Sequence, residues 1–175
     1  HVGRFHYAKN HEFLLEIFAE LIKQKENAVL FLLGDGPRRA EMEAKAREMG
    51  IANAVVFAGN KNPVAPFYQA FDAFLFPSRF EGMPGTVLEA QAAGLPCLIS
   101  DSITSQVKAT ELVEFMSLEK SASCWADAFW KQIEGSKECI QEGAFTLIDT
   151  FYDVTYQVKC YEQFYLTGDI VYLKE

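Results

Sequence analysis

Several features that would point to a function at once are missing from this 175-residue sequence. No apolar run approaches the roughly 20 residues that a membrane-spanning helix needs, so no such helix is expected. Cysteine is sparse, and its four widely spaced copies include no Cys-x-x-Cys pair, which excludes the usual zinc spacing and favours reduced thiols in a cytosolic protein. Positive charge is limited too: 16 Lys and Arg against 24 Asp and Glu give a net charge of −8, which argues against a nucleic-acid partner.

The beginning of the chain lacks an initiator methionine and a signal peptide. The opening HVGRF (1–5) is typical of the interior of a strand, so we expect the sequence to be a piece of a longer protein. Half of the residues are apolar and 14% are aromatic, which predicts a folded domain with a real core. The acidic balance leaves an anionic small ligand open, because helix N-termini and a few local cations can hold phosphate.

Short apolar runs alternate with helical patterns through the first 100 residues. Asn10 is expected to cap the first helix, and Gly50 and Gly94 to end later ones. Strands are predicted at 1–5, 28–33, 54–59, 73–76 and 96–100, and helices at 12–24, 38–50, 64–70 and 86–93. This alternation predicts an α/β fold with a doubly wound parallel sheet, which binds its ligands at the carboxyl ends of the strands.

The remaining residues carry a weaker pattern. An edge strand is expected at 113–118 and a helix at 121–135. We therefore expect a domain at 1–135 and a C-terminal helical tail at 136–175. Within the tail, Asp153 could cap an aromatic helix that docks either on its own domain or on a partner.

Three loops at the ends of predicted strands carry candidate ligand groups. Arg4 and Lys9 could converge on an anion, or could be two solvated loop charges. The glycines of Gly34-Asp35-Gly36-Pro37 could let a ligand approach the backbone, or could simply make a tight turn. The same two explanations hold for Gly59-Asn60, which lies at the mouth of the same crevice.

The stretch FPSRFEGMPGTVLEAQAAG (76–94) places Glu81 and Glu89 on either side of a small-residue turn. Free backbone amides at the start of the following helix are expected to form a phosphate site. Thr86 could donate to that phosphate or cap the helix. Glu89 could accept ribose hydroxyls or only complement the helix dipole, and Glu81 could accept hydroxyls of a sugar beyond the phosphates.

Taken together, VGRF…KNH, LLGDGP, VFAGN and FPSRFEGMPGTVLEAQAAGLPCLIS resemble the C-terminal, donor-binding half of a family-four (group 1) glycosyltransferase of the GT-B fold. The resemblance runs in order from residue 2 to about residue 102. It implies a Rossmann-like domain that binds a nucleotide diphosphate sugar for transfer with retained anomeric configuration. It also implies no metal and no other cofactor, and the sequence has no Asp-x-Asp that would hold a cation.

The resemblance also implies a role for each residue of the candidate site. Glu81 would be the catalytic residue on the donor sugar, and Glu89 would bind the ribose. The base would lie near Gly59 and Asn60. The remaining donor-binding groups are expected to be the diphosphate ligands Arg4, Lys9, Gly85, Thr86 and Val87, and the backbone lining the sugar at Gly82, Met83 and Pro84.

The partner domain of a GT-B enzyme is not in this sequence. The resemblance implies that an N-terminal domain binds the acceptor, so the isolated chain is expected to bind the donor but not to transfer sugar. It further implies a cytoplasmic enzyme of cell-surface polysaccharide or glycolipid synthesis, whose full-length form can associate with the inner face of the plasma membrane. Two alternatives stay open: a nucleotide-sugar 2-epimerase of the same fold, and a non-catalytic nucleotide-binding module.

Overall fold

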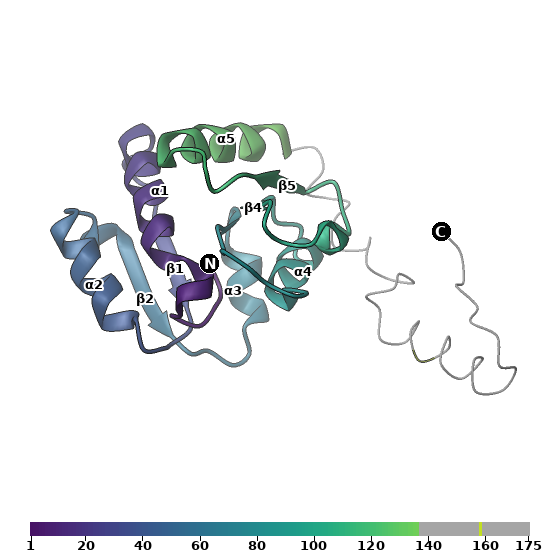
Figure 1. Cartoon of the computed structure of the whole chain (residues 1–175), viewed down its shortest axis with the longest axis horizontal. Helices are drawn as coiled ribbons and strands as arrows, with labels where there is room; N and C mark the ends of the chain where they lie inside the picture. The colour runs from purple at the N-terminus through teal and green to yellow at the C-terminus, as the bar shows by residue number, and fades with distance from the viewer. Residues whose placement is uncertain (137–157, 159–175) are drawn as a thin grey trace, which may run out of the picture.

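The computed structural model of this chain describes residues 1–136 and Val158 (Figure 1). The tail helix expected after Asp153, like most of the tail at 136–175, lies outside the described residues. None of the described helices is long and apolar enough to cross a membrane.

The first part of the chain forms a parallel pair of strands with two helices. Leu30 on one strand lies opposite Val55 on the other. In chain order the elements are η1 (Tyr7–Lys9), α1 (His11–Gln24), β1 (Leu30–Leu33), α2 (Arg39–Glu48), η2 (Ala52–Ala54) and β2 (Val55–Gly59). The predicted helix–strand alternation is confirmed here, with boundaries that differ by only a few residues.

The second part forms a three-stranded parallel ladder in which β4 is the middle strand. Its elements are α3 (Ala65–Ala70), β3 (Phe74–Phe76), α4 (Gly85–Ala92), β4 (Cys97–Ser100), η3 (Ser105–Val107), β5 (Val113–Met116) and α5 (Ala122–Gly135). Gly94 follows α4 with a φ of +78°, as expected for the glycine that ends a helix.

The N-terminal segment lies between the two ladders and joins them. Val2 bridges Leu33 of β1 in parallel, and the ring Nδ1 of His1 lies 3.0 Å from the carbonyl oxygen of Leu75 in β3. Residues 1–5 therefore make a single strand-like bridge and not the full strand that HVGRF predicts. They still place this segment beside β1 and in contact with β3, and the strands are parallel within each ladder.

Helices cover both faces of the sheet, as a doubly wound fold requires. Side chains alternate along β3 and β4: Leu75 and Leu98 join the core beneath α1, α2 and α5, whereas Phe74 and Ile99 join the core beneath α3 and α4. On the first face, α1 and α5 lie side by side (Figure 1). The predicted fold class is confirmed.

Two loops contain contacts that the sequence did not predict. Asn10 lies at the N-cap position of α1, as predicted, but its side chain makes no capping hydrogen bond; its backbone is left-handed, with a φ of 55°, and its side chain bonds elsewhere. Gly34 and Gly36 lie so close to the backbone of the first loop that a side chain at either position would collide with it. A Cβ at Gly34 would lie 2.1 Å from the carbonyl oxygen of Gly3, and one at Gly36 would lie 2.6 Å from that of Phe5. These glycines therefore let the first loop pack onto the β1 end.

Candidate functional site

Two loops at the carboxyl ends of the strands are held against each other. The Nδ2 of Asn10 donates to the carbonyl oxygen of Pro77 at 3.0 Å, and the amide of Arg79 donates to that of Ala8 at 2.7 Å. The guanidinium of Arg79 also lies 4.6 Å from the ring centre of Tyr7. The loop after the N-terminal segment and the loop after β3 therefore form one surface.

Lys9 and Glu81 meet where these two loops join. The Nζ of Lys9 lies 2.8 Å from the Oε1 of Glu81, and the side chains are only 18% and 16% exposed. The same ammonium lies 4.6 Å from the ring centre of Phe76, the last residue of β3. Sequence reasoning placed both residues in the site but did not predict that they bind each other.

The N-terminus of α4 leaves an open approach between the two glutamates. A Cβ added at Gly82 or at Gly85 would meet no other atom within 4 Å. The amide of Val87 donates to the carbonyl oxygen of Pro84 at 3.0 Å, so it is already used within the turn. Over the part of the chain that the structure describes, the amides of Gly85 and Thr86 have no hydrogen-bond partner.

Thr86 does not cap α4 with its hydroxyl. Pro84 occupies the N-cap position without a side-chain bond, and Oγ1 of Thr86 is buried without a partner among the described residues. Of the two roles that the sequence suggested for this threonine, the structure therefore excludes capping. A buried Oγ1 beside two free amides leaves the donor role open.

Glu89 lies on the exposed side of α4 and is held there by a buried tyrosine. The phenol of Tyr68 on α3 donates to the Oε2 of Glu89 at 2.8 Å, and its oxygen lies 3.2 Å from the carbonyl oxygen of Thr86. Burial, followed by the bond to Glu89, raises the pKa of Tyr68 well above its ordinary value. The phenol is therefore a neutral donor throughout the physiological range.

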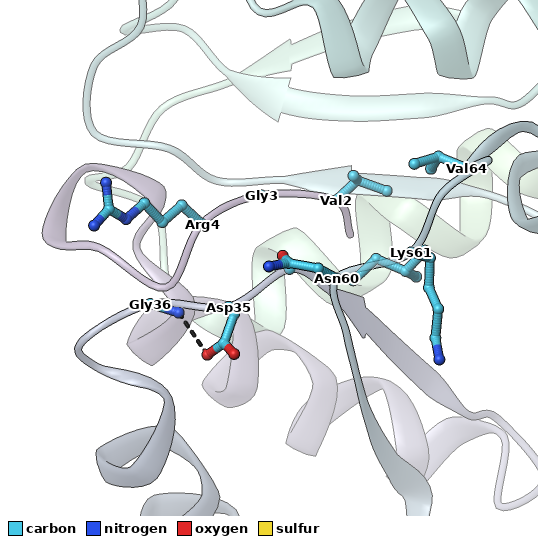
Figure 2. Close-up of a pocket in the computed structure, with 10 residues that line it drawn as sticks. Val2, Gly3, Arg4, Asp35, Gly36, Asn60, Lys61 and Val64 are labelled. Atoms are coloured by element: carbon cyan, nitrogen blue, oxygen red, sulfur yellow. Dashed lines mark hydrogen bonds between the residues drawn. The ribbon is translucent and has the colours of Figure 1, made fainter.

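A cavity of about 520 Å³ lies at the carboxyl ends of β1 and β2. Figure 2 shows the residues that line it. Its polar side chains are Arg4, Asp35, Asn60 and Lys61. The side chains of Val2 and Val64 and the backbone at the ends of β1 and of the N-terminal segment complete its wall. Arg4 is exposed and forms no ion pair or side-chain hydrogen bond with the described residues. Gly3 connects the cavity to the ion pair, because a Cβ there would lie 3.1 Å from the Cδ and Cε atoms of Lys9.

The structure thus brings the predicted residues to one edge of the sheet. Asn60 and Arg4 line the cavity, Lys9 and Glu81 lie beside it, and Glu89 lies one helical turn into α4. A second cavity of about 530 Å³ lies at the opposite end, where residues before β1 and β3 line it with mostly apolar side chains. Because doubly wound sheets bind ligands at the carboxyl ends of their strands, the candidate site is the first cavity and its surroundings.

Sequence reasoning missed Tyr68 and Arg79. Tyr68 lies in a six-residue helix, which is too short for a periodic pattern to indicate what its side chain faces. Arg79 was visible as the one cation within PSRFEG, but its stacking on Tyr7 depends on a loop from another part of the chain.

Comparisons with known proteins agree on one family. The profile described as "Glycosyl transferases group 1" matches residues 1–132. The putative glycosyltransferase EpsF of Bacillus subtilis is 44% identical over 128 residues, which are 73% of this chain and 33% of EpsF. The chain spans a third or less of the length of the curated relatives it matches.

Solved structures share the fold. TarM of S. aureus, in complex with fondaparinux, α-GlcNAc-glycerol and UDP, has a TM-score of 0.80 at 14% identity, over 93% of this chain and 34% of TarM. The C-terminal domain of LpcC, a group 1 family protein of Francisella tularensis, has a TM-score of 0.70 at 19% identity, over 87% of this chain and 85% of that domain.

Proposed function

Because the chain belongs to the group 1 glycosyltransferases, we propose that it is the part of such an enzyme that binds the nucleotide diphosphate sugar. One observation carries this proposal. The ion pair of Lys9 with Glu81 and the exposed carboxylate of Glu89 lie on either side of the open amides of α4, beside a 520 Å³ cavity. The donor consists of a sugar, a diphosphate and a nucleoside in that order. This order matches Glu81, the amides at the start of α4 and Glu89.

The diphosphate belongs at the centre of this arrangement. The free amides of Gly85 and Thr86 and the positive end of the α4 dipole favour an anion there. Lys9 adds a nearby ammonium, and Arg4 is a further cation on the cavity wall. These groups would also stabilise the charge that develops on the leaving diphosphate, so we propose that transfer needs no metal ion.

The two glutamates would hold the ends of the donor. Glu81 would accept hydroxyls of the sugar, whose ring would lie along the open backbone of Gly82-Met83-Pro84. Glu89 would accept the ribose hydroxyls, and the base would extend toward Gly59 at the end of β2 and Asn60 on the cavity wall. We propose that the donor reacts with retained configuration, with these residues orienting it and not moving protons.

In the whole protein, the acceptor would be bound by a domain facing this edge. The group 1 family and the name of EpsF support sugar transfer over epimerisation, and polysaccharide or glycolipid synthesis is the corresponding role. We also propose a cytoplasmic location with peripheral contact to the membrane. Free thiols at Cys97 and Cys124 are in keeping with a reducing compartment.

Isothermal titration of the 175-residue chain with UDP and with GDP tests the proposal. We expect saturable binding of at least one of them and no sugar transfer by this chain alone. No binding of either nucleotide would overturn the proposal, and transfer at the rate of a full-length protein would overturn its dependence on a second domain. Product analysis with a full-length protein, as glycosylated acceptor or epimerised sugar nucleotide, separates the transferase from the epimerase.

A further inference from the structure

The phenol of Tyr68 lies beneath the candidate ribose site. The side chain is only 3% exposed, and its ring packs against Phe74 at 5.8 Å and Phe71 at 6.5 Å between centroids. Its hydroxyl is the polar end of a side chain whose ring is surrounded by apolar groups. Such a group is costly to bury without a partner, and its shorter contact is to the carboxylate of Glu89 at 2.8 Å, against 3.2 Å to the carbonyl oxygen of Thr86.

This bond distinguishes the two oxygens of Glu89. Oε2 accepts the phenol proton, whereas Oε1 has no partner among the residues that the structure describes. A carboxylate on an exposed helix surface would otherwise rotate freely among several conformations. The hydrogen bond fixes the plane of the carboxylate and leaves Oε1 and a lone pair of Oε2 available to a ligand.

We propose that Tyr68 is a positioning residue: its phenol holds the Glu89 carboxylate in the orientation that accepts the two vicinal hydroxyls of the donor's ribose. This inference rests on the proposed function, because it concerns the nucleotide that the proposed function places there. It names a residue that acts through Glu89 and does not itself touch the ligand.

A phenol suits this task better than a cation would. A lysine or arginine paired with Glu89 would neutralise the carboxylate and compete with the ribose for its oxygens. The hydroxyl of Tyr68 has only one proton to donate, so the carboxylate keeps its charge and most of its accepting capacity. Burial keeps that proton in place by raising the pKa of the phenol.

The test compares Tyr68→Phe with the parent chain for binding of UDP and of 2′,3′-dideoxyuridine diphosphate by isothermal titration. Phenylalanine keeps the packing of the ring and removes only the hydroxyl. We expect Tyr68→Phe to weaken UDP binding roughly three- to tenfold, as for loss of one net hydrogen bond. The dideoxy nucleotide should bind both proteins equally, and in a Glu89→Ala background Tyr68→Phe should have no further effect on UDP.

The other outcomes overturn the inference in distinguishable ways. Equal losses for the two nucleotides, or a further loss in the Glu89→Ala background, would show that Tyr68 acts only on the stability or general shape of the site. No loss of UDP affinity would show that the phenol does not position the carboxylate. If the parent chain binds both nucleotides equally, Glu89 does not hold the ribose. If it binds neither UDP nor GDP, the proposed function itself fails.

Discussion

The ammonium of Lys9 and the carboxylate of Glu81 form a 2.8 Å ion pair that joins two loops at the carboxyl edge of the sheet. Neither side chain is more than 18% exposed, so solvent screens this pair less than a surface pair. An ammonium has three donors, and Lys9 can therefore hold Glu81 and still bind a phosphate. The pair thus lies between the place proposed for the sugar and the place proposed for the diphosphate.

Lys9→Met tests the cation of this pair. Methionine keeps an apolar stem against Phe76 but removes the ammonium, so UDP affinity should fall by roughly tenfold or more, as for a charge-assisted hydrogen bond. Titration calorimetry measures the change. The control is Lys25→Met, which removes a cation from the cavity at the opposite end of the sheet and should leave UDP affinity unchanged. Equal losses in the two variants would indicate only a general effect of net charge.

Glu89→Ala and Glu81→Ala test the division of roles between the glutamates. Loss of Glu89 should weaken UDP binding by about 1.5–3 kcal/mol, the range for hydrogen bonds to a charged group. Loss of Glu81 should spare UDP binding and weaken only the binding of a UDP-sugar. Glu114→Ala, an exposed glutamate on β5, is the matched control. Equal losses of UDP affinity in the two site variants would contradict this division.

Gly34→Ala tests the close approach of the first loop to the end of β1. At Gly34, φ is +133° and the new Cβ would lie 2.1 Å from the carbonyl oxygen of Gly3. At Gly50, φ is +73° but the space around the Cβ is open, so Gly50→Ala isolates the backbone cost of about 1–2 kcal/mol. Gly34→Ala should cost at least about 1 kcal/mol more, because the chain must also move away. Urea unfolding of both variants measures the difference, and equal costs would contradict the close contact.

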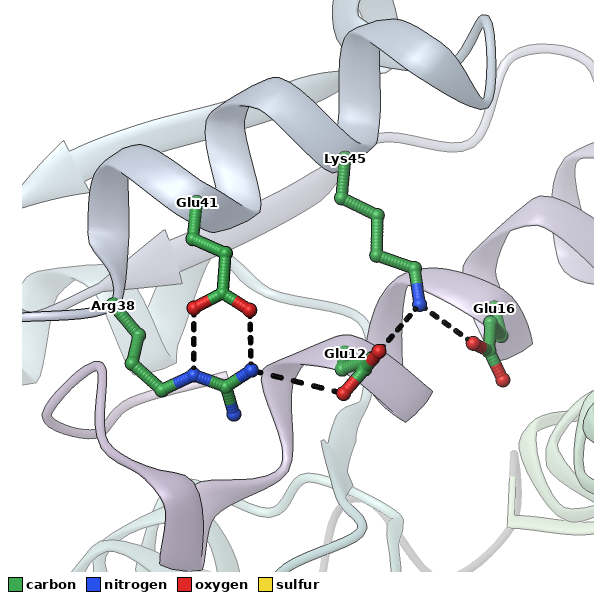
Figure 3. Close-up of polar contacts among 5 residues, drawn as sticks. All are labelled: Glu12, Glu16, Arg38, Glu41 and Lys45. Carbon is green, nitrogen blue, oxygen red and sulfur yellow. Dashed lines mark hydrogen bonds and ion pairs between the residues drawn. The ribbon is translucent and has the colours of Figure 1, made fainter.

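Substitution of Glu12 tests the ion-pair network between α1 and α2 (Figure 3). Lys45 binds both Glu12, at 3.1 Å, and Glu16, at 2.7 Å, and Arg38 lies 3.7 Å from Glu12. The hydrogen bond from Lys45 lowers the pKa of Glu12 below its ordinary value. A carboxyl whose pKa is lower in the folded state stabilises the fold above its unfolded pKa, and this contribution is lost as the pH falls through the folded pKa.

Glu12→Gln should therefore lower the free energy of unfolding at pH 7 by at most about 1 kcal/mol, since the pair is partly exposed and screened. The difference from the parent chain should close as the pH falls into the acid range where Glu12 is protonated. Denaturant unfolding at several pH values measures both effects. Glu26→Gln changes an exposed glutamate with no partner among the described residues and should show neither effect. A difference that persists unchanged at acid pH would rule out the ion pair as its cause.

Local patterns in the sequence were sufficient for much of the fold and for part of the site. Continuous apolar runs predicted β1, β2 and β4. Burial on both faces explains the run in β4, whereas Val56 of β2 is 38% exposed. The amphipathic stripe of 12–24 predicted α1. The spacing of Glu81 and Glu89 around a small-residue turn indicated which end of the sheet would hold a ligand.

Contacts between distant segments were decided only by the tertiary structure. Three such contacts join loops or helices that follow different strands. They are the hydrogen bond from Tyr68 to Glu89, the ion pair of Lys9 with Glu81 and the hydrogen bond from Asn10 to Pro77. Gly34 likewise fits a turn pattern in the sequence. The structure shows that glycine is needed there because the backbone of Gly3 lies too close for a Cβ. A residue's own neighbours in the chain fix its backbone preference and its place in a periodic pattern. Its hydrogen-bond partner depends on how the sheet orders its strands, and that order exists only once the chain has folded.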